Sequence, residues 1–120
     1  MQEIGIESSL LRQVLSGDKT IEARLGKPKF LKIRVGDTLS LREDVWIDGN
    51  IADQIHDRAT VQVTQLLYFE SFEEMFSAVS YKAAVPTAES RLDALDIYRQ
   101  LYSKEDEYEY GVVALTFKLV

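Results

Sequence analysis

The sequence has no cysteine among its 120 residues and a single histidine, His56. The missing cysteine excludes disulfide bonds, thiolate nucleophiles and cysteine-ligated zinc, and it fits a reducing compartment. A single histidine excludes a metal site built from several histidines and leaves a serine triad dependent on that one residue. We interpret His56, in a polar run, as a solvated loop residue. We expect no bound metal and no cofactor.

Long apolar runs are also absent. Nowhere do eighteen consecutive apolar residues occur, so the sequence predicts no membrane-spanning helix. The first thirteen residues lack the apolar run of a signal peptide, and we therefore expect a cytoplasmic location. The hydrophobic fraction of 46% and the length of 120 residues are those of one globular domain. We expect a single domain over residues 1–120, and the sequence leaves its oligomeric state open.

Positive charge is scarce and concentrated in one segment. The net charge of −6 discourages general affinity for polyanions. Residues 12–42 carry eight basic and three acidic side chains, whereas residues 43–120 carry six basic and fifteen acidic ones. The basic segment could bind an anion locally, while the acidic remainder discourages non-specific association. Charge also fluctuates along any chain of this length, and composition alone leaves both interpretations open.

Hydrophobic spacing and capping residues predict three main helices. The first begins with a serine cap at Ser8 or Ser9 and ends before Gly17. A second follows the capping box of residues 71–74. The longest is expected from Pro86 to about residue 102, and residues 104–109 are expected to form one short turn. Four side chains of the longest helix are expected to face the core: Leu92, Leu95, Tyr98 and Leu101 (or Tyr102).

Strands are expected between these helices without a regular alternation. The segments with strand character are residues 20–25, 38–42, 45–47, 50–51, 59–69 and 111–119. Asp48-Gly49 is typical of a tight hairpin turn between two of them. Because strands and helices do not alternate, the pattern predicts an α+β fold, a small mixed barrel rather than a Rossmann sheet.

The basic segment contains the octapeptide Gly17-Asp18-Lys19-Thr20-Ile21-Glu22-Ala23-Arg24. In an extended strand, Glu22 and Arg24 point to one face while the residues between and before them point to the other. Glu22 can then hold one edge of the guanidinium, and Arg24 can present its remaining donors to a phosphate or a base edge. Lys19 lies where its ammonium could reach the same opening. On composition alone, a surface ion pair of little energetic value remains the simpler interpretation.

The octapeptide matches the G-x-K-x-x-E-x-R pattern of the ASCH family, relatives of the PUA RNA-binding domains. Further segments resemble this family in the expected order: Gly36-Asp37-Thr38-Leu39, Tyr68, Ser71-Phe72-Glu73-Glu74-Met75, Tyr98, Tyr102-Ser103 and Tyr110-Gly111-Val112-Val113-Ala114. The resemblance implies a PUA-like β-barrel of about five to six strands with three to four flanking helices. It also implies a cleft, lined by the octapeptide, that binds RNA or a nucleotide or nucleoside.

The expected ligand-binding residues come from the octapeptide and from the aromatic residues near the end of the chain: Lys19, Thr20, Glu22, Arg24, Tyr108 and Tyr110. Exposed aromatic rings can stack on bases. Tyr108 and Tyr110 flank Glu109 beside Gly111, and Trp46, at the predicted hairpin, is a further candidate.

Enzymatic activity is a second interpretation of the same cleft. One branch of the superfamily is associated with hydrolysis of N4-acetylcytidine by a lysine, a threonine nucleophile and a glutamate. Lys19 matches the lysine, but Glu22 occupies the threonine position and the third role has no matching residue. If the protein is a ribonuclease or a nucleoside hydrolase, Lys19 and Glu22 are the expected catalytic residues. A carboxylate held ionised by neighbouring cations is, however, a weak base near neutral pH.

A third interpretation is a protein-interaction module. It would use the acidic residues 104–109 or the long predicted helix as its binding surface.

Overall fold

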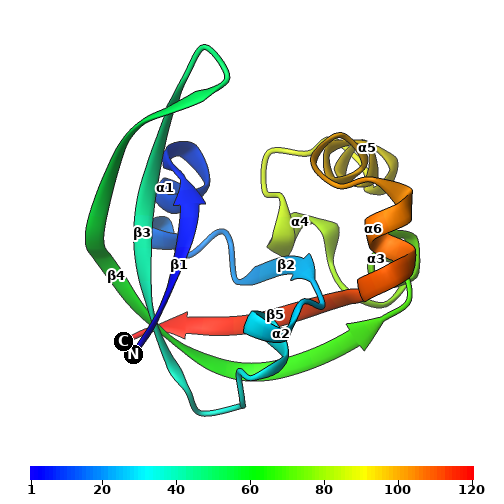
Figure 1. Ribbon diagram of the computed structural model, residues 1–120, viewed down its shortest axis with the longest axis horizontal. Coiled ribbons are helices and arrows are strands. Elements are labelled where there is room, and N and C mark those ends of the chain that lie inside the picture. Colours follow the sequence, from blue (N-terminus) through cyan, green and yellow to red (C-terminus); the bar gives the residue numbers. More distant parts are fainter.

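The computed structural model describes residues 1–120 and shows a curled five-stranded sheet with six helices (Figure 1). The strands are β1 (Gln2–Glu7), β2 (Ile21–Leu25), β3 (Thr38–Ile47), β4 (Asn50–Phe69) and β5 (Val112–Leu119). The helices are α1 (Ser8–Ser16), α2 (Pro28–Leu31), α3 (Phe72–Ala78), α4 (Tyr81–Ala84), α5 (Arg91–Leu101) and α6 (Lys104–Tyr110). None of these helices combines the length and the apolar character needed to cross a bilayer.

The sheet has the order β1-β3-β4-β5-β2, so β1 and β2 are its two edges. β1 runs parallel to β3, and the other neighbouring strands are antiparallel. The sheet curls into a half-barrel in which β1 and β2 are not paired with each other (Figure 1). This confirms the predicted α+β class and a strand count at the lower end of the expected range. The six helices exceed the expected three to four, because α2 and α4 are single turns of four residues.

Two hydrophobic clusters lie on the two sides of the half-barrel. One joins β1, β3 and β4 to α1 and α2, and the other joins β2 to α3, α4 and α5. β5 contributes to both clusters, with Val113, Leu115 and Phe117 in the first and Val112 and Ala114 in the second. In Figure 1 the corresponding halves stand on the left and right, joined at the bottom by β4 and β5. The space between β1 and β2 is therefore bounded by two separate cores.

The helix α1 spans the predicted residues, but a serine does not cap it. The carboxylate of Glu7 accepts hydrogen bonds from the amides of Ser9 and Leu10, because both serines already lie in the first helical turn. Gly17, with a φ of 87°, ends the helix in the left-handed conformation, as predicted.

The predicted hairpin at Asp48-Gly49 is confirmed, but its strands are longer than expected. β3 continues to Ile47 and β4 runs for twenty residues from Asn50. The pairing register of the two strands shifts twice, and such bulges increase the twist of a ribbon. Residues 50–58 are all exposed, so no alternation of buried and exposed side chains marks them as a strand in the sequence.

The longest helix begins later than predicted, and part of its predicted core face is exposed. α5 starts at Arg91 rather than near Pro86, because the Ser90 hydroxyl caps it by accepting from the amide of Asp93. Two leucines that were expected in the core, Leu92 and Leu101, are mostly exposed. Tyr98 is buried as predicted, Leu95 and Tyr102 pack against the same core while partly exposed, and Ala94 is buried in addition.

The other predicted helix ends are close to those observed. The Ser71 hydroxyl caps α3 by accepting from the Glu74 amide, as the capping box predicted. Residues 104–110 form the seven-residue helix α6 rather than a single turn, with Ser103 as its cap. The buried Glu107 carboxylate connects α6 to both neighbours, because it accepts from the amide of Phe72 and from Arg99.

Candidate functional site

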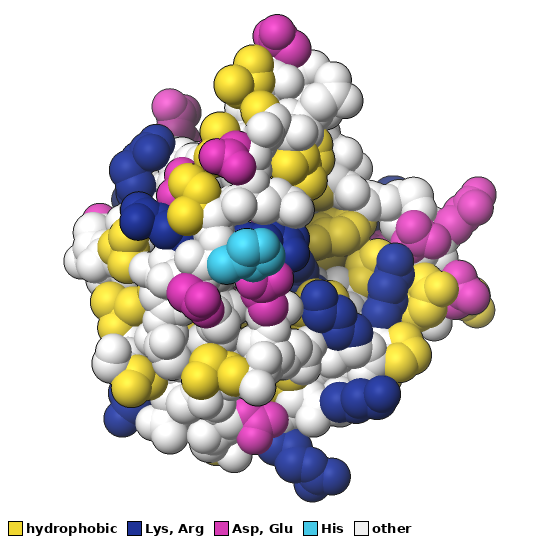
Figure 2. All heavy atoms as spheres, turned by 60° about the vertical axis from the view of Figure 1, so that its left-hand side comes forward, with side chains coloured by type: hydrophobic (Ala, Val, Ile, Leu, Met, Phe, Trp, Pro, Cys, Tyr) yellow, Lys and Arg dark blue, Asp and Glu magenta, His cyan; other side chains and the backbone are white.

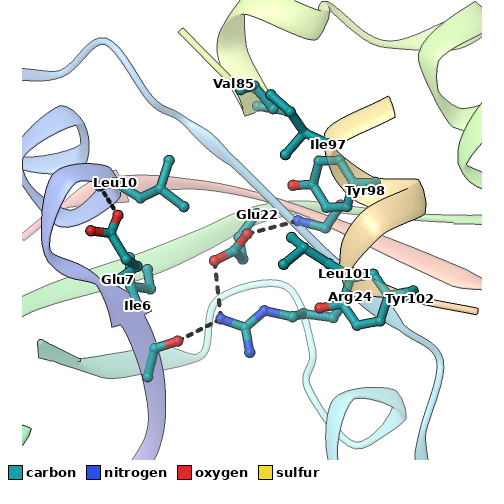
Figure 3. Close-up of a pocket in the computed structure, with 13 residues that line it drawn as sticks. Ile6, Glu7, Leu10, Glu22, Arg24, Val85, Ile97, Tyr98, Leu101 and Tyr102 are labelled. Carbon is teal, nitrogen blue, oxygen red and sulfur yellow. Dashed lines mark hydrogen bonds and ion pairs between the residues drawn. The ribbon is translucent and has the colours of Figure 1, made fainter. Parts of the chain in front are cut away.

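A pocket lies between the two edge strands, β1 and β2, where the half-barrel is open (Figure 3). Its cavity volume of about 120 Å³ is comparable to the ~150 Å³ protein cavity that holds benzene. Its apolar wall comes from both halves of the molecule: Ile6, Leu10, Val85, Ile97 and Leu101. Its polar groups come from Glu7 at the end of β1, from Glu22 and Arg24 of β2 and from the tyrosines Tyr98 and Tyr102. The pocket therefore has room for one ring-sized group with polar contacts on one side.

Arg24 spans the gap between the two edge strands. Its Nη2 donates to the carbonyl oxygen of Gly5 on β1, at 2.6 Å, and to Oε2 of Glu22, at 3.1 Å. A guanidinium has five N–H donors, and Nε and Nη1 of Arg24 make no hydrogen bond within the protein. In Figure 3 Nη1 points away from Glu22. Arg24 is thus fixed at one corner of its fork, while 21% of its side chain is exposed and three donors remain available.

Glu22 holds Arg24 in this orientation. Its Oε1 accepts from the amide of Ala23 at 3.2 Å and lies 3.6 Å from Nζ of Lys19, so both carboxylate oxygens have partners. Burial raises the pKa of Glu22, but the charges of Lys19 and Arg24 outweigh this effect and leave the pKa below its ordinary value of 4.5. Glu22 is therefore ionised at neutral pH and is suited to orienting Arg24 rather than to accepting a proton.

Lys19 lies beneath Glu22 and does not line the pocket. The residue is only 1% exposed, and its Nζ donates to the carbonyl oxygens of Ile21 and Ala84. Burial lowers the pKa of Lys19, and the nearby Glu22 carboxylate opposes this effect in part. The expectation that the Lys19 ammonium reaches the opening is therefore wrong, because two backbone carbonyls and Glu22 surround it.

Three of the four charged side chains of the octapeptide share a structural role at the open edges. On β2, the carbonyl of Ile21 accepts from Lys19 and the amide of Ala23 donates to Glu22. On β1, the carbonyl of Gly5 accepts from Arg24. These backbone groups would be bonded to a neighbouring strand in a closed barrel. Side chains take the place of that strand.

Tyr98 and Tyr102 are pocket residues that the sequence analysis did not assign to the site. In Figure 3 their hydroxyl oxygens lie on the pocket side, near Glu22 and Arg24. Burial raises the pKa of Tyr98 well above its usual value, and it also raises the pKa of Tyr102. The Tyr102 hydroxyl has no hydrogen-bond partner within the protein. Both rings stack on Phe72, with centroids 4.9 and 5.3 Å away, so the hydroxyls are held by rigid aromatic packing.

The remaining predicted site residues lie outside this pocket. Thr20 uses its backbone to bond Ala83 and lies beside the pocket without lining it. Tyr108, 93% exposed, and Tyr110 border a different, shallow depression beside the end of β4. Trp46 is exposed on the β3–β4 hairpin. The structure brings Lys19, Glu22 and Arg24 together but does not place the other residues with them.

His56 is exposed, as expected, but it lies within β4 and not in a loop. Its Nδ1 lies 2.5 Å from Oε2 of Glu3, which is also paired with Arg42. Arg42 also donates to the carboxylate of Asp44. These two side chains lie over the backbone of Gly5, because a Cβ added to this glycine would lie 2.2 Å from the Asp44 carboxylate. The structure contains no group of three or more His, Cys, Asp and Glu side chains arranged to hold a metal ion.

The lowered pKa of Glu22 predicts a specific loss of stability in acid. A carboxylate with a depressed pKa in the folded state stabilises the fold above its ordinary pKa, and this contribution is lost as the pH falls through the folded-state value. We expect Glu22→Gln to lower the free energy of unfolding at pH 7, and the difference from the wild type to shrink as the pH falls below 4.5. Urea unfolding across this range measures both quantities. A difference that does not change with pH would contradict the assignment.

The ASCH domain model matches residues 4–120, and the chain therefore belongs to the ASCH family. The match covers nearly the whole chain and confirms the resemblance drawn from the octapeptide and the segments that follow it. No curated protein matches the chain.

Three solved structures share the fold. Hypothetical protein PH0355 is 27% identical with a TM-score of 0.83, over 99% of this chain and 98% of its own. Protein PF0455 from Pyrococcus furiosus is 27% identical with a TM-score of 0.74, over 99% and 96%. Protein EF3133 from Enterococcus faecalis V583 is 15% identical with a TM-score of 0.61, over 93% and 67%, and shows the fold alone.

Proposed function

We propose that the protein binds RNA or a nucleotide by holding one ring-sized group in the pocket between β1 and β2. The observation that carries the proposal is Arg24. Its guanidinium is fixed by Glu22 and Gly5 on one side, and it keeps three N–H donors without a partner on the other. A guanidinium fork of this kind matches the acceptor groups of a phosphate or a base edge.

The surroundings of Arg24 support the same class of ligand. Of the charged groups that line the pocket, Glu7 accepts from the amides of Ser9 and Leu10 and Glu22 is paired with Arg24, so Arg24 supplies the free hydrogen-bond donors for an anionic or electron-rich group. The apolar wall, including Leu10 and Ile97, can cover the face of a ring, and the Tyr102 hydroxyl offers a further hydrogen bond. Membership of the ASCH family points to RNA or a nucleotide as the source of such a group.

The geometry favours binding over turnover. A catalytic Lys19 would have to touch the substrate, but its ammonium is buried and bonded to two backbone carbonyls. Glu22 has a lowered pKa and partners on both oxygens, so it is a poor general base. In this proposal Lys19 supports Glu22, Glu22 orients Arg24, and Arg24 contacts the ligand.

The test is the affinity of Arg24→Gln for a short single-stranded RNA and for the four ribonucleoside 5′-monophosphates. We expect the affinity for the best of these ligands to fall about 30-fold, because a hydrogen bond from a charged donor contributes roughly 2 kcal/mol. Isothermal titration calorimetry measures the affinity, and amide chemical-shift mapping locates the site.

Two further variants make the result specific. Arg12→Gln removes an exposed, unpaired arginine on α1 and should leave the affinity unchanged. Tyr102→Phe removes a hydroxyl without a protein partner and should weaken binding a few-fold while the fold is retained. Wild-type affinity in both a folded Arg24→Gln variant and Tyr102→Phe would exclude this pocket as the site.

A further inference from the structure

A group of unpaired cations lies on α2 and on the loops at either end of this helix. Residues 23–36 contain five basic side chains and no acidic one, in a protein whose net charge is −6. One of the five is Arg24, and the other four form what we call the basic ridge: Lys27, Lys29, Lys32 and Arg34. All four are exposed, and none takes part in an ion pair. Four like charges within eight residues repel one another unless an anion screens them.

The basic ridge is continuous with Arg24 through one aromatic ring. The guanidinium carbon of Arg24 lies 5.4 Å from the ring centroid of Phe30 and Nζ of Lys29 lies 5.6 Å from the same centroid, so both cations border one ring. A second cation of the ridge also lies against an aromatic ring, since Nζ of Lys27 is 5.3 Å from the ring centroid of the exposed Tyr110. On the face shown in Figure 2, dark blue Lys and Arg side chains gather at the lower right, beside yellow apolar ones.

We propose that the basic ridge binds the backbone phosphates of a single-stranded RNA that places one of its groups in the Arg24 pocket. This inference rests on the proposed function and specifies the ligand as single-stranded RNA rather than a free nucleotide. A free nucleotide in the pocket brings only its own phosphate, which Arg24 can bind. An RNA strand carries further phosphates past α2, where the four unpaired cations of the basic ridge can bind them.

Acidic side chains elsewhere on the protein confine the RNA to the side of the pocket that carries the basic ridge. The helices on the other side of the pocket carry an excess of acidic side chains: Glu73, Glu74, Asp93, Asp96, Glu105, Asp106 and Glu109. Their repulsion directs a polyanion away from α3, α5 and the acidic first turn of α6 and toward α2. Tyr110 stands beside Lys27 at the end of the ridge, where its partly exposed ring can stack on a neighbouring base.

The experiment compares two variants of the full chain with the same net charge of about −10, four units below the wild type. The ridge variant is Lys27→Gln, Lys29→Gln, Lys32→Gln, Arg34→Gln. The control variant is Arg12→Gln, Lys82→Gln, Lys104→Gln, Lys118→Gln, four exposed cations that also lack ion pairs. Fluorescence anisotropy with a labelled single-stranded RNA of about eight nucleotides gives the affinity between 50 and 200 mM salt, and calorimetry gives the affinity for ribonucleoside monophosphates.

We expect the ridge variant to lose about tenfold or more in RNA affinity. The slope of log affinity against log salt should become shallower by roughly 2 to 3, because each phosphate contact to a single-stranded nucleic acid contributes about 0.7 to this slope. The control variant should change both quantities little. Monophosphate affinity should be similar in the wild type and both variants.

Four results would overturn the inference. Equal losses in the ridge and control variants would show an effect of net charge alone. If binding depends on Arg24 but the RNA binds no more tightly than a monophosphate, the proposed pocket stands and the proposed role of the ridge fails. If neither ligand binds in a way that depends on Arg24, both proposals fail. Ridge-dependent cosedimentation with phosphatidylserine vesicles, without RNA binding, would assign the ridge to a lipid surface.

Discussion

Lys19→Met is expected to lower the free energy of unfolding by about 3 kcal/mol, because removing one partner of a buried charge cluster leaves the others uncompensated. The Lys19 ammonium is buried and bonds the carbonyls of Ile21 and Ala84. Its loss leaves both carbonyls without a donor and leaves Glu22 with Arg24 as its only cationic partner. Methionine has a similar length and no charge, so the substitution removes the interaction with little change in volume. Urea unfolding at pH 7 measures the difference.

The matched control is Lys82→Met on α4, where the lysine is exposed and unpaired, and its expected effect is within about 0.5 kcal/mol. The double variant Lys19→Met, Glu22→Gln should be less destabilised than the sum of the single variants, because the two side chains interact directly. If Lys19→Met were as stable as Lys82→Met, the buried ammonium would have no structural role.

Phe72→Ala should destabilise the fold by roughly 4 kcal/mol, within the range for removing a buried aromatic ring. Phe72 is among the largest fully buried side chains and stacks on both Tyr98 and Tyr102. Its removal opens a cavity behind the tyrosines that form one side of the pocket, so the affinity of the remaining folded protein for its ligand should also fall. Urea unfolding and calorimetry measure the two effects.

Tyr68→Ala is the control for this substitution, because Tyr68 lies on β4 and is more than half exposed. Its expected cost is well below that of Phe72→Ala. Phe72→Leu should give an intermediate loss, since it refills part of the cavity. A stability change in Phe72→Ala no larger than that of Tyr68→Ala would mean that the ring stack contributes little.

The elements with local determinants were predictable from the sequence. Strand geometry placed Glu22 and Arg24 on one face, and their ion pair in the structure confirms this. Gly17 ends α1 and Ser71 caps α3 because a left-handed residue and a capping hydroxyl act within one turn of the chain. The hairpin at Asp48-Gly49 follows from turn chemistry in the same way.

The missed features depend on contacts distant in sequence. β1 was not expected, because Gly5 interrupts its pattern and its parallel partner β3 lies more than thirty residues further along the chain. The burial of Lys19 depends on the carbonyl of Ala84, which is 65 residues away. Tyr98 was assigned to the core from its helical spacing, and only the position of α5 beside β2 shows that its hydroxyl faces the pocket.

The open side of the half-barrel has a consequence for self-association. Unpaired strand edges are templates on which other chains can add strands and aggregate, and a closed barrel avoids this by having no edges. Here the carbonyls of Gly5 and Ile21 and the amide of Ala23 are already bonded to charged side chains of the octapeptide. A foreign strand would have to displace Lys19, Glu22 and Arg24 from these groups and leave their charges without partners. The octapeptide therefore protects the protein against intermolecular strand addition while the side of the barrel that holds the Arg24 pocket stays open.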